Sequence, residues 1–171
     1  MSRVVNNTVV SNFAYVDRMD LLQLLFGKVY LTPEVHEEVA RGIASGHTFL
    51  THAQQEIGPE DSHWLQLTTY QNQAEFDLYL SLCEQLDFGE ASCLAIAKPR
   101  GWLFLTDDRA ARRLASTLNV DVSGTLGVLK LAIEGDLLEL SDGNDLLQQM
   151  IRGRYRSPID DLSEIIEQGR P

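Results

Sequence analysis

Four carboxylates stand where the order of the predicted elements could build a metal site. Two of them, Asp107 and Asp108, directly follow residues 102–105, an unbroken apolar run typical of a strand buried on both faces. Ligands of open parallel sheets bind beyond the carboxyl ends of the strands, and paired carboxylates there can bind a divalent cation. The structural alternative is that either aspartate caps the helix predicted to begin near Arg109.

Glu90 occupies an unusual position for a charged residue on its predicted helix. Cys93, Leu94 and Ala97 lie three, four and seven positions after it, so Glu90 shares the stripe that faces the core. A carboxylate there is costly unless it is paired, hydrogen-bonded or coordinated. The alternative is that a first-turn glutamate interacts with the helix dipole and still reaches water.

Glu38 lies three positions after Val35 and next to Val39, at the border of the apolar face of its predicted helix. Considered alone, it would be a solvated surface residue. Its neighbour Glu37 stands four positions before Arg41 and is explained by a surface ion pair. Glu38 becomes a candidate ligand because acids on three separate segments follow separate strands, whose carboxyl ends converge in this class of fold.

The elements that must position these acids alternate between strand and helix. We expect strands at residues 3–5, 29–31, 64–67, 102–105 and 120–122. We expect helices at residues 9–25, 33–44, 73–84, 90–97, 109–118, 125–134, 137–151 and 160–167, and a polar, turn-rich loop at 46–62. The alternation predicts a three-layer α/β/α fold with a central, mostly parallel sheet. We expect one domain over residues 1–171, with a C-terminal helical extension from about residue 137.

Composition excludes several classes of protein. The 171 residues, 44% of them apolar, suffice for one core of ordinary size, so a disordered chain is disfavoured. No apolar run is long enough to cross a bilayer and the first residues lack a secretory signal, which favours the cytoplasm. Two cysteines, Cys83 and Cys93, lie in apolar helical patterns and are expected to be buried thiols.

The charge is unevenly distributed along the chain. The net charge of -11 argues against nonspecific duplex binding through a basic surface. Residues 1–90 hold 4 Lys and Arg against 13 Asp and Glu, whereas residues 91–171 hold 10 against 12. Solvated helix faces would explain any single arginine, but the clustering keeps a phosphate-binding interpretation open. The late basic residues form two groups: Lys98, Arg100, Arg109, Arg112 and Arg113, and then Arg152, Arg154 and Arg156.

Several short motifs, in order along the chain, resemble the PIN-domain family. Residues 4–14 (VVNNTVVSNFA), with 20–22 and 26–27, resemble the family's opening, in which a first strand ends in Asp before a small polar residue and an apolar helix. Residues 31–39, 86–97 and 105–112 resemble the segments that carry the second, third and fourth acids. Residues 123–129 and 154–158 resemble a subgroup related to the toxins of bacterial toxin/antitoxin pairs.

The resemblance implies a metal-dependent endoribonuclease that hydrolyses phosphodiester bonds of single-stranded RNA with Mg²⁺ or Mn²⁺. Carried over by position, Glu38, Glu90 and Asp108 would be the catalytic metal ligands. Asp107 would be a further carboxylate ligand or the helix cap. Thr8 and Thr106 would orient ligands or water, and Arg109, Arg112 and Arg113 would bind RNA beside the acids.

The position expected to hold the first Asp holds Asn6, and Asn7 follows it. An amide oxygen can ligate a hard cation but carries no charge, so metal affinity and water activation should fall. Asp17 or Asp20 could substitute from the following helix, although no spacing argument places either in the site. The alternative function is therefore a PIN-like domain that is weakened or inactive at Asn6 and serves as a binding or regulatory module.

Other interpretations have less support in the residues. A receiver-like phosphoryl site would use the Asp107-Asp108 pair, but in receivers the acid pair follows an early strand. The four histidines lack metal-ligand spacing, and Ser11 and Ser92 have no identifiable base partner. The family resemblance alone implies a homodimer and a possible antitoxin protein that covers the acidic groove.

Overall fold

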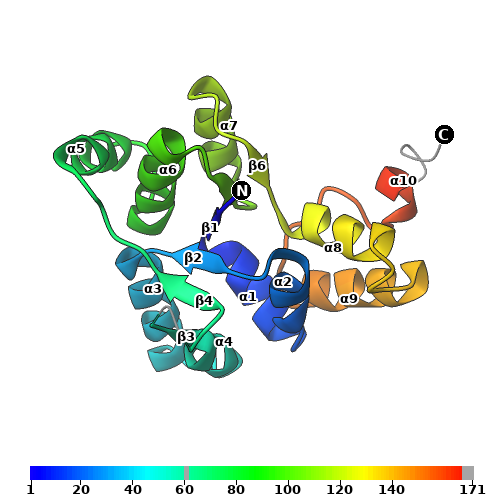
Figure 1. Ribbon diagram of the computed structural model, residues 1–171. Helices are drawn as coiled ribbons and strands as arrows, with labels where there is room; N and C mark the ends of the chain where they lie inside the picture. The colour runs from blue at the N-terminus through cyan, green and yellow to red at the C-terminus, as the bar shows by residue number, and fades with distance from the viewer. Residues whose placement is uncertain (60–61, 167–171) are drawn as a thin grey trace.

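The structure is a computed structural model that describes residues 1–59 and 62–166, and within these ranges a central sheet lies between two layers of helices (Figure 1). The described strands are β1 (Arg3–Val5), β2 (Val29–Leu31), β3 (Ile57–Gly58), β4 (Leu65–Leu67), β5 (Leu103–Leu105) and β6 (Val122–Ser123). The described helices are α1 (Asn7–Tyr15), α2 (Asp20–Phe26), α3 (Pro33–Ala44), α4 (Leu50–Glu56), α5 (Gln73–Leu82), α6 (Phe88–Arg100), α7 (Arg109–Thr117), α8 (Thr125–Glu134), α9 (Leu140–Arg152) and α10 (Ser163–Ile166). The predicted three-layer α/β/α fold is confirmed.

The sheet has the order β3-β4-β2-β1-β5-β6, and every described strand pair is parallel. The strand β1 lies near the centre, with Val4 opposite Tyr30 of β2 and opposite Phe104 of β5. From β1 the chain moves to β2 on one side, whereas from β5 it moves to β6 on the other. The connections therefore diverge between β1 and β5, which is where open parallel sheets bind ligands.

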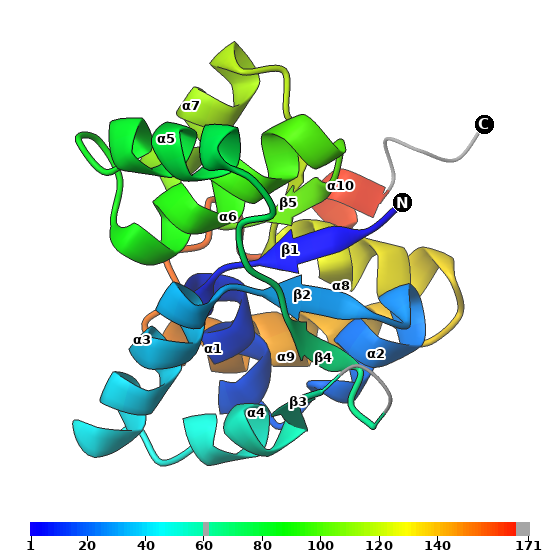
Figure 2. The same ribbon diagram turned by 60° about the vertical axis from the view of Figure 1, so that its left-hand side comes forward.

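The helices that cover the two faces come from different parts of the chain (Figure 2). One face carries α5, α6 and α7, with α6 packed on β1 and β5. The other face carries α1, α2, α8 and α9, which pack on one another. Between the layers, Val4, Val5, Phe104 and Leu105 are fully buried. The core thus fixes β1 and β5 side by side, so that the segments after them emerge together at one edge.

Local capping explains where the helices near this edge begin. The Thr32 side chain accepts a hydrogen bond from the Val35 amide, with Pro33 in the first turn, as the sequence predicts for α3. The Asp108 carboxylate accepts a 2.7 Å bond from the Ala111 amide and so caps α7. At the other end of α6, Gly101 ends the helix with φ of 62°, a left-handed conformation that favours glycine.

Two regions differ from the sequence-based expectations. The helix predicted over residues 9–25 is two helices, α1 and α2, because the chain turns between them with Asp17 at a positive φ of 55°. The loop expected at residues 46–62 contains α4 and β3. Only Leu50 and Ala53 of α4 are buried, which leaves too few apolar positions for its helical period to stand out.

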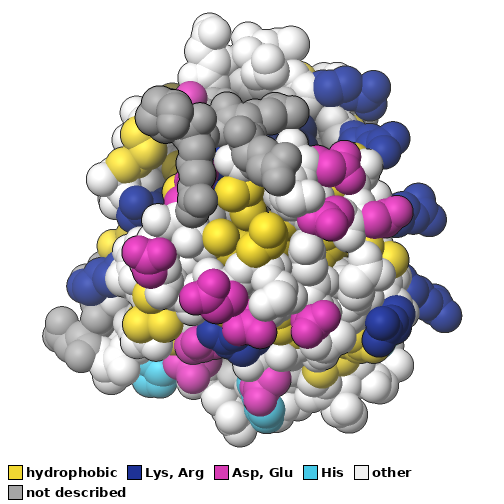
Figure 3. All heavy atoms as spheres, turned by 90° about the vertical axis from the view of Figure 1, so that its right-hand side faces the viewer, with side chains coloured by type: hydrophobic (Ala, Val, Ile, Leu, Met, Phe, Trp, Pro, Cys, Tyr) yellow, Lys and Arg dark blue, Asp and Glu magenta, His cyan; other side chains and the backbone are white. Residues whose placement is uncertain are grey.

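The remaining elements lie close to their predicted ranges, with ends shifted by a few residues. The last expected helix, residues 160–167, is shorter: α10 spans Ser163–Ile166, and Glu167 lies outside the described residues. Over the C-terminal helices the surface mixes both signs of charge, with carboxylates across the centre and most Lys and Arg in view along one edge (Figure 3). Among the helices of the described ranges, none combines the length and apolar character needed to span a bilayer.

Candidate functional site

Asn6 directly follows β1 and is the N-cap of α1. Its Oδ1 accepts hydrogen bonds from the Thr8 hydroxyl at 2.7 Å and from the Val9 amide at 3.4 Å. Its Nδ2 donates to the Thr106 hydroxyl at 2.8 Å, across to the end of β5. Because Asn6 is only 1% exposed and both ends of its amide are engaged, it orients Thr8 and Thr106 as well as capping the helix.

A cavity of about 520 Å³, here called the acidic cavity, opens beside Asn6. Glu38 reaches it from α3, and Asp87 and Glu90 reach it from the start of α6. Its lining includes Asn6, Thr8, Glu38, Arg41, Asp87 and Glu90. The structure thus brings three carboxylates and the buried amide of Asn6 to one place at the carboxyl edge of the sheet.

The carboxylate of Glu38 is held by the main chain of α6. Its Oε1 accepts a hydrogen bond of 3.1 Å from the Gly89 amide. Burial raises the pKa of Glu38, while this hydrogen bond and the charge of Arg41 act in the opposite direction. A Cβ atom at Gly89 would lie 2.5 Å from Oε1 of Glu38, so a larger residue there would displace this carboxylate from its present position. Gly89 is therefore the residue that fixes Glu38 in the cavity.

Glu90 is half-buried and surrounded by other acids. Its pKa is raised to about 7, mainly by burial and then by the charges of Asp108, Asp87 and Glu38. The charge of Asp108 is thus near enough to raise the pKa of Glu90. Asp108 is nevertheless not among the residues that line the acidic cavity. Glu90 therefore links the Glu38 side of the site to the Asp108 side.

The side chains of Asp107 and Asp108, which follow β5, have different hydrogen-bond partners. Asp108 caps α7, and its own amide donates to the Thr106 hydroxyl at 3.1 Å. Asp107 does not cap that helix, which corrects one of the two roles expected for it. The carboxylate of Asp107 instead accepts bonds from the Thr125 amide at 2.8 Å and the Thr125 hydroxyl at 2.6 Å.

Two further donors complete the surroundings of Asp107. Asn12 donates from α1 at 3.2 Å, and the Tyr155 hydroxyl donates from the segment after α9 at 3.4 Å. Burial raises the pKa of Asp107, and the bonds from Thr125 partly oppose that effect. Asp107 thus ties together α1, α8 and the C-terminal segment, and its oxygens are occupied by these contacts.

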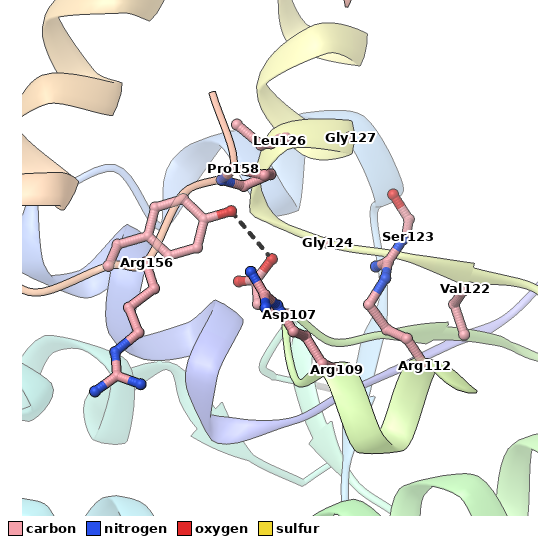
Figure 4. Close-up of a pocket in the computed structure, with 11 residues that line it drawn as sticks. Asp107, Arg109, Arg112, Val122, Ser123, Gly124, Leu126, Gly127, Arg156 and Pro158 are labelled. Atoms are coloured by element: carbon pink, nitrogen blue, oxygen red, sulfur yellow. Dashed lines mark hydrogen bonds between the residues drawn. The ribbon is translucent and has the colours of Figure 1, made fainter. Parts of the chain in front are cut away.

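The arginines near the acids gather around a second cavity, of about 320 Å³, here called the arginine pocket (Figure 4). Arg109 and Arg112 come from α7, and Tyr155 and Arg156 from the segment after α9. Arg113 lies outside this pocket and lines a separate cavity with Gln85 and Leu86. Of the three arginines expected to bind RNA, the structure therefore brings two together and directs the third elsewhere.

Several residues of the site escaped the sequence analysis. Arg41 lines the acidic cavity, and no ion pair joins it to Glu37 within the part of the chain that the structure describes. Asp87 and Gly89 lie in the motif at residues 86–91, where only Glu90 had been singled out. The position of Asp87 before a predicted helix could have marked it as a neighbour of Glu90.

The proposed substitutes for the missing first acid lie outside the site. Asp17 is hydrogen-bonded to His52 at 3.0 Å, and Asp20 forms an ion pair with Arg18 at 2.8 Å, both at the turn between α1 and α2. In residues 1–59 and 62–166, no three His, Cys, Asp or Glu side chains are gathered closely enough to hold a metal ion as they stand. The charges of Asp108, Asp87 and Glu38 act on Glu90, but these carboxylates do not surround a common point at which an ion could bind.

The chain is similar to a known protein family over almost its whole length. A family model described as "PIN domain" matches residues 2–170 of the chain. No curated protein matches it.

Proposed function

The chain belongs to the PIN-domain family, and from this premise we propose that it is a metal-dependent endoribonuclease that cleaves single-stranded RNA at the acidic cavity. The observation that supports the proposal is that Glu38, Asp87 and Glu90 line one cavity beside Asn6. Burial, followed by the charges of Asp108, Asp87 and Glu38, raises the pKa of Glu90 in this cavity to about 7. Such a concentration of like charge is costly in a folded protein unless a cation neutralises it. Family membership also replaces the receiver-like interpretation of the aspartate pair.

The residues fit Mg²⁺ or Mn²⁺ in the chemistry of their donors. Glu38, Glu90 and Asp108 offer hard carboxylate oxygens, and they would hold the ion, with the Asn6 amide as a neutral fourth donor. A bound ion of this kind supplies a water of lowered pKa and stabilises charge that develops on a phosphate. Because the acids do not surround a common point as they stand, binding would draw their side chains together.

The protein's own residues prepare this site in two ways. The Gly89 amide orients Glu38, and the Ala111 amide orients Asp108. The Asn6 side chain holds the hydroxyls of Thr8 and Thr106 at the edge of the cavity. Burial and the neighbouring acids raise the pKa of Glu90 to about 7 without metal, and a bound cation would favour the ionised carboxylate that can ligate it.

The second candidate function is a PIN domain that binds RNA but cleaves it weakly or not at all. Asn6 favours this reading, because its amide oxygen already accepts two hydrogen bonds and carries no charge. The proposal of toxin-like behaviour, with a homodimer and an antitoxin partner, rests on the family resemblance, including that of residues 123–129 and 154–158 to the toxin-related subgroup. The cytoplasmic location expected from the sequence also stays a proposal.

The test is cleavage of an end-labelled single-stranded oligoribonucleotide with Mn²⁺ or EDTA, by the wild type and by Asp108→Asn. Asparagine caps helices about as well as aspartate, so this variant removes the charge and keeps the α7 cap. We expect Mn²⁺-dependent internal cleavage that falls about a hundredfold in Asp108→Asn and is unchanged in the exposed control Asp145→Asn. Cleavage that survives EDTA or the Asp108→Asn change contradicts the proposal.

A further inference from the structure

The arginine pocket carries more positive charge than its own carboxylate can neutralise. Three arginines, Arg109, Arg112 and Arg156, are among the residues that line it, together with a single acid, Asp107. The carboxylate of Asp107 already accepts hydrogen bonds from Thr125, Asn12 and Tyr155. The charge of Arg112 also acts on it. An excess of positive charge at a concave surface favours an anionic ligand.

The arginines differ in how far the protein has engaged them. Arg112 donates from Nη1 to the carbonyl oxygen of Thr106 at 2.9 Å and faces the charge of Asp107, so it is largely structural. Within residues 1–59 and 62–166, no ion pair includes Arg109 or Arg156, and both are exposed. These two guanidinium groups are therefore available to a ligand, and the planar fork of each matches the oxygens of a phosphate.

The rest of the lining suits the organic part of such a ligand. Val122, Leu126 and Pro158 give the pocket apolar walls (Figure 4), and Tyr155 is also among the residues that line it. A volume of about 320 Å³ lies at the lower end of the range for small-molecule sites. The pocket thus pairs cationic groups with apolar surface, which is the combination that a nucleoside phosphate requires.

A third cavity, of about 530 Å³, adjoins both the arginine pocket and the acidic cavity. It shares Arg109, Tyr155 and Arg156 with the arginine pocket. It shares Asn7 and Thr8 with the acidic cavity. The three cavities therefore adjoin one another, with the acids lining one end of the row and the arginines the other.

We propose that the arginine pocket is a phosphate-binding subsite that takes a nucleoside phosphate unit through Arg109 and Arg156. That this unit belongs to an RNA strand whose neighbouring phosphate lies at the acidic cavity rests on the proposed function. The pocket itself does not depend on cleavage. A free nucleoside monophosphate or inorganic phosphate presents the same oxygens, so the experiment separates these sources.

The test measures binding in EDTA, where no metal-dependent cleavage takes place. Calorimetry with inorganic phosphate and with adenosine 5′-monophosphate compares the wild type with the Arg109→Gln/Arg156→Gln double variant. The matched control is Lys28→Gln/Lys130→Gln, which removes the same number of positive charges at residues that line none of the cavities described above. We expect the double variant to bind the nucleotide about tenfold more weakly and the control to bind within about twofold of the wild type.

A second arm uses fluorescence anisotropy with a labelled single-stranded oligoribonucleotide in EDTA. If the pocket holds a phosphate of the strand, the double variant binds RNA more weakly than the wild type. The slope of the logarithm of its RNA-binding constant against the logarithm of salt concentration is then shallower by about 1. Loss of nucleotide affinity without loss of RNA affinity assigns the pocket to free nucleotides and overturns the RNA part. Equal nucleotide binding by the wild type and the double variant overturns the proposal, whatever the cleavage assay shows.

Discussion

The side-chain amide of Asn6 donates a 2.8 Å hydrogen bond to the hydroxyl of Thr106, which lies 100 residues further along the chain. This bond joins the ends of β1 and β5 at the point where the sheet connections diverge. The Thr106 hydroxyl also accepts from the Asp108 amide at 3.1 Å, so its oxygen accepts two hydrogen bonds. The pair therefore couples the residue in the first acid position to the segment that carries Asp108.

We predict that Asn6→Asp increases Mn²⁺-dependent cleavage by about tenfold or more. The Thr106 hydroxyl can rotate to donate to the new carboxylate, while the Val9 amide and the Thr8 hydroxyl continue to donate to it. The added charge lies among other acids, so the variant should unfold more easily in EDTA and regain stability with Mn²⁺. Gel-based cleavage and thermal melts measure both effects.

Asn7→Asp is the matched control, because it makes the same chemical change one residue later, where the side chain accepts from Ser11 within α1. It should raise cleavage much less than Asn6→Asp does. Equal gains in the two variants would show that added negative charge, rather than a ligand at position 6, is responsible.

Glu90 should make the metal-free protein less stable as the pH rises. Its folded pKa of about 7 is raised above the ordinary 4.5, so folding favours the protonated form. Its contribution is fully present below pH 4.5 and is lost as the pH rises through 7. In EDTA at pH 8, Glu90→Gln should therefore raise the free energy of unfolding by about 1 kcal/mol after allowance for solvent screening.

The measurement is urea denaturation of the wild type and of Glu90→Gln at pH 5 and pH 8, with the exposed Glu84→Gln as control. The two proteins should converge at pH 5, and Mn²⁺ should stabilise the wild type more than the variant at pH 8. A stability difference independent of pH would mean that ionisation of Glu90 is not its cause.

Gly89→Ala should reduce cleavage by acting on Glu38. The new Cβ would lie 2.5 Å from Oε1 and 2.7 Å from Oε2 of Glu38, so the carboxylate must leave its hydrogen bond with the amide of residue 89. Alanine is otherwise favourable in a helix, so the fold should survive. We expect a loss of about tenfold in kcat/KM with little change in the melting temperature.

A double-mutant cycle identifies the cause of that loss. If Gly89→Ala acts through the displaced carboxylate, then adding it to Glu38→Ala should produce no further decrease. Independent, additive losses would assign to Gly89 a role apart from Glu38.

The pair of Arg100 and Glu75 should dominate the stability of the region around α5. The two guanidinium nitrogens Nε and Nη2 donate to the Glu75 carboxylate at 2.8 and 2.7 Å, and the two side chains are 9% and 2% exposed. Arg100→Met leaves the carboxylate buried without its partner, which costs about 3–5 kcal/mol. Lys130→Met, which removes the exposed pair with Glu134, should cost less than about 0.5 kcal/mol.

The pH dependence of this pair has the opposite sign to that of Glu90. The hydrogen bonds from Arg100 lower the pKa of Glu75, so its contribution is present above the unfolded pKa and disappears as the pH falls through the folded one. Thermal melts should therefore show a smaller difference between the wild type and Arg100→Met in acid than at pH 7. A difference that grows on acidification would contradict this assignment.

Helices and strands could be predicted from the sequence where neighbouring residues alone determine where the element begins or how deeply it is buried. The Thr32-Pro33 start of α3 and the apolar run that contains β5 are of this kind, because capping and uninterrupted burial leave direct marks in the sequence. The helix α4 left no such mark. Its helical state depends on packing against α1 and α3, which a sequence window of that length does not show.

The site was harder to predict from the sequence than the fold, because the contacts that form it join segments far apart in the chain. The sequence left open which of Asp107 and Asp108 would cap α7, since both positions precede the helix. The contact of Asp107 with Tyr155, 48 residues away, settles where its carboxylate lies. The roles expected for Glu38, Glu90 and Asp108 as ligands stay predictions for the experiments above, and the role expected for Arg113 in RNA binding also stays a prediction.

The most direct test of the account is the position of Mn²⁺ in crystals of the protein, located by its anomalous scattering. The account predicts an ion bound by carboxylate oxygens of Glu38, Glu90 and Asp108, about 2.2 Å from each, and absent from Glu90→Gln crystals. A Mn²⁺ ion bound elsewhere at saturating concentration, or no ion beside these three residues, would contradict it.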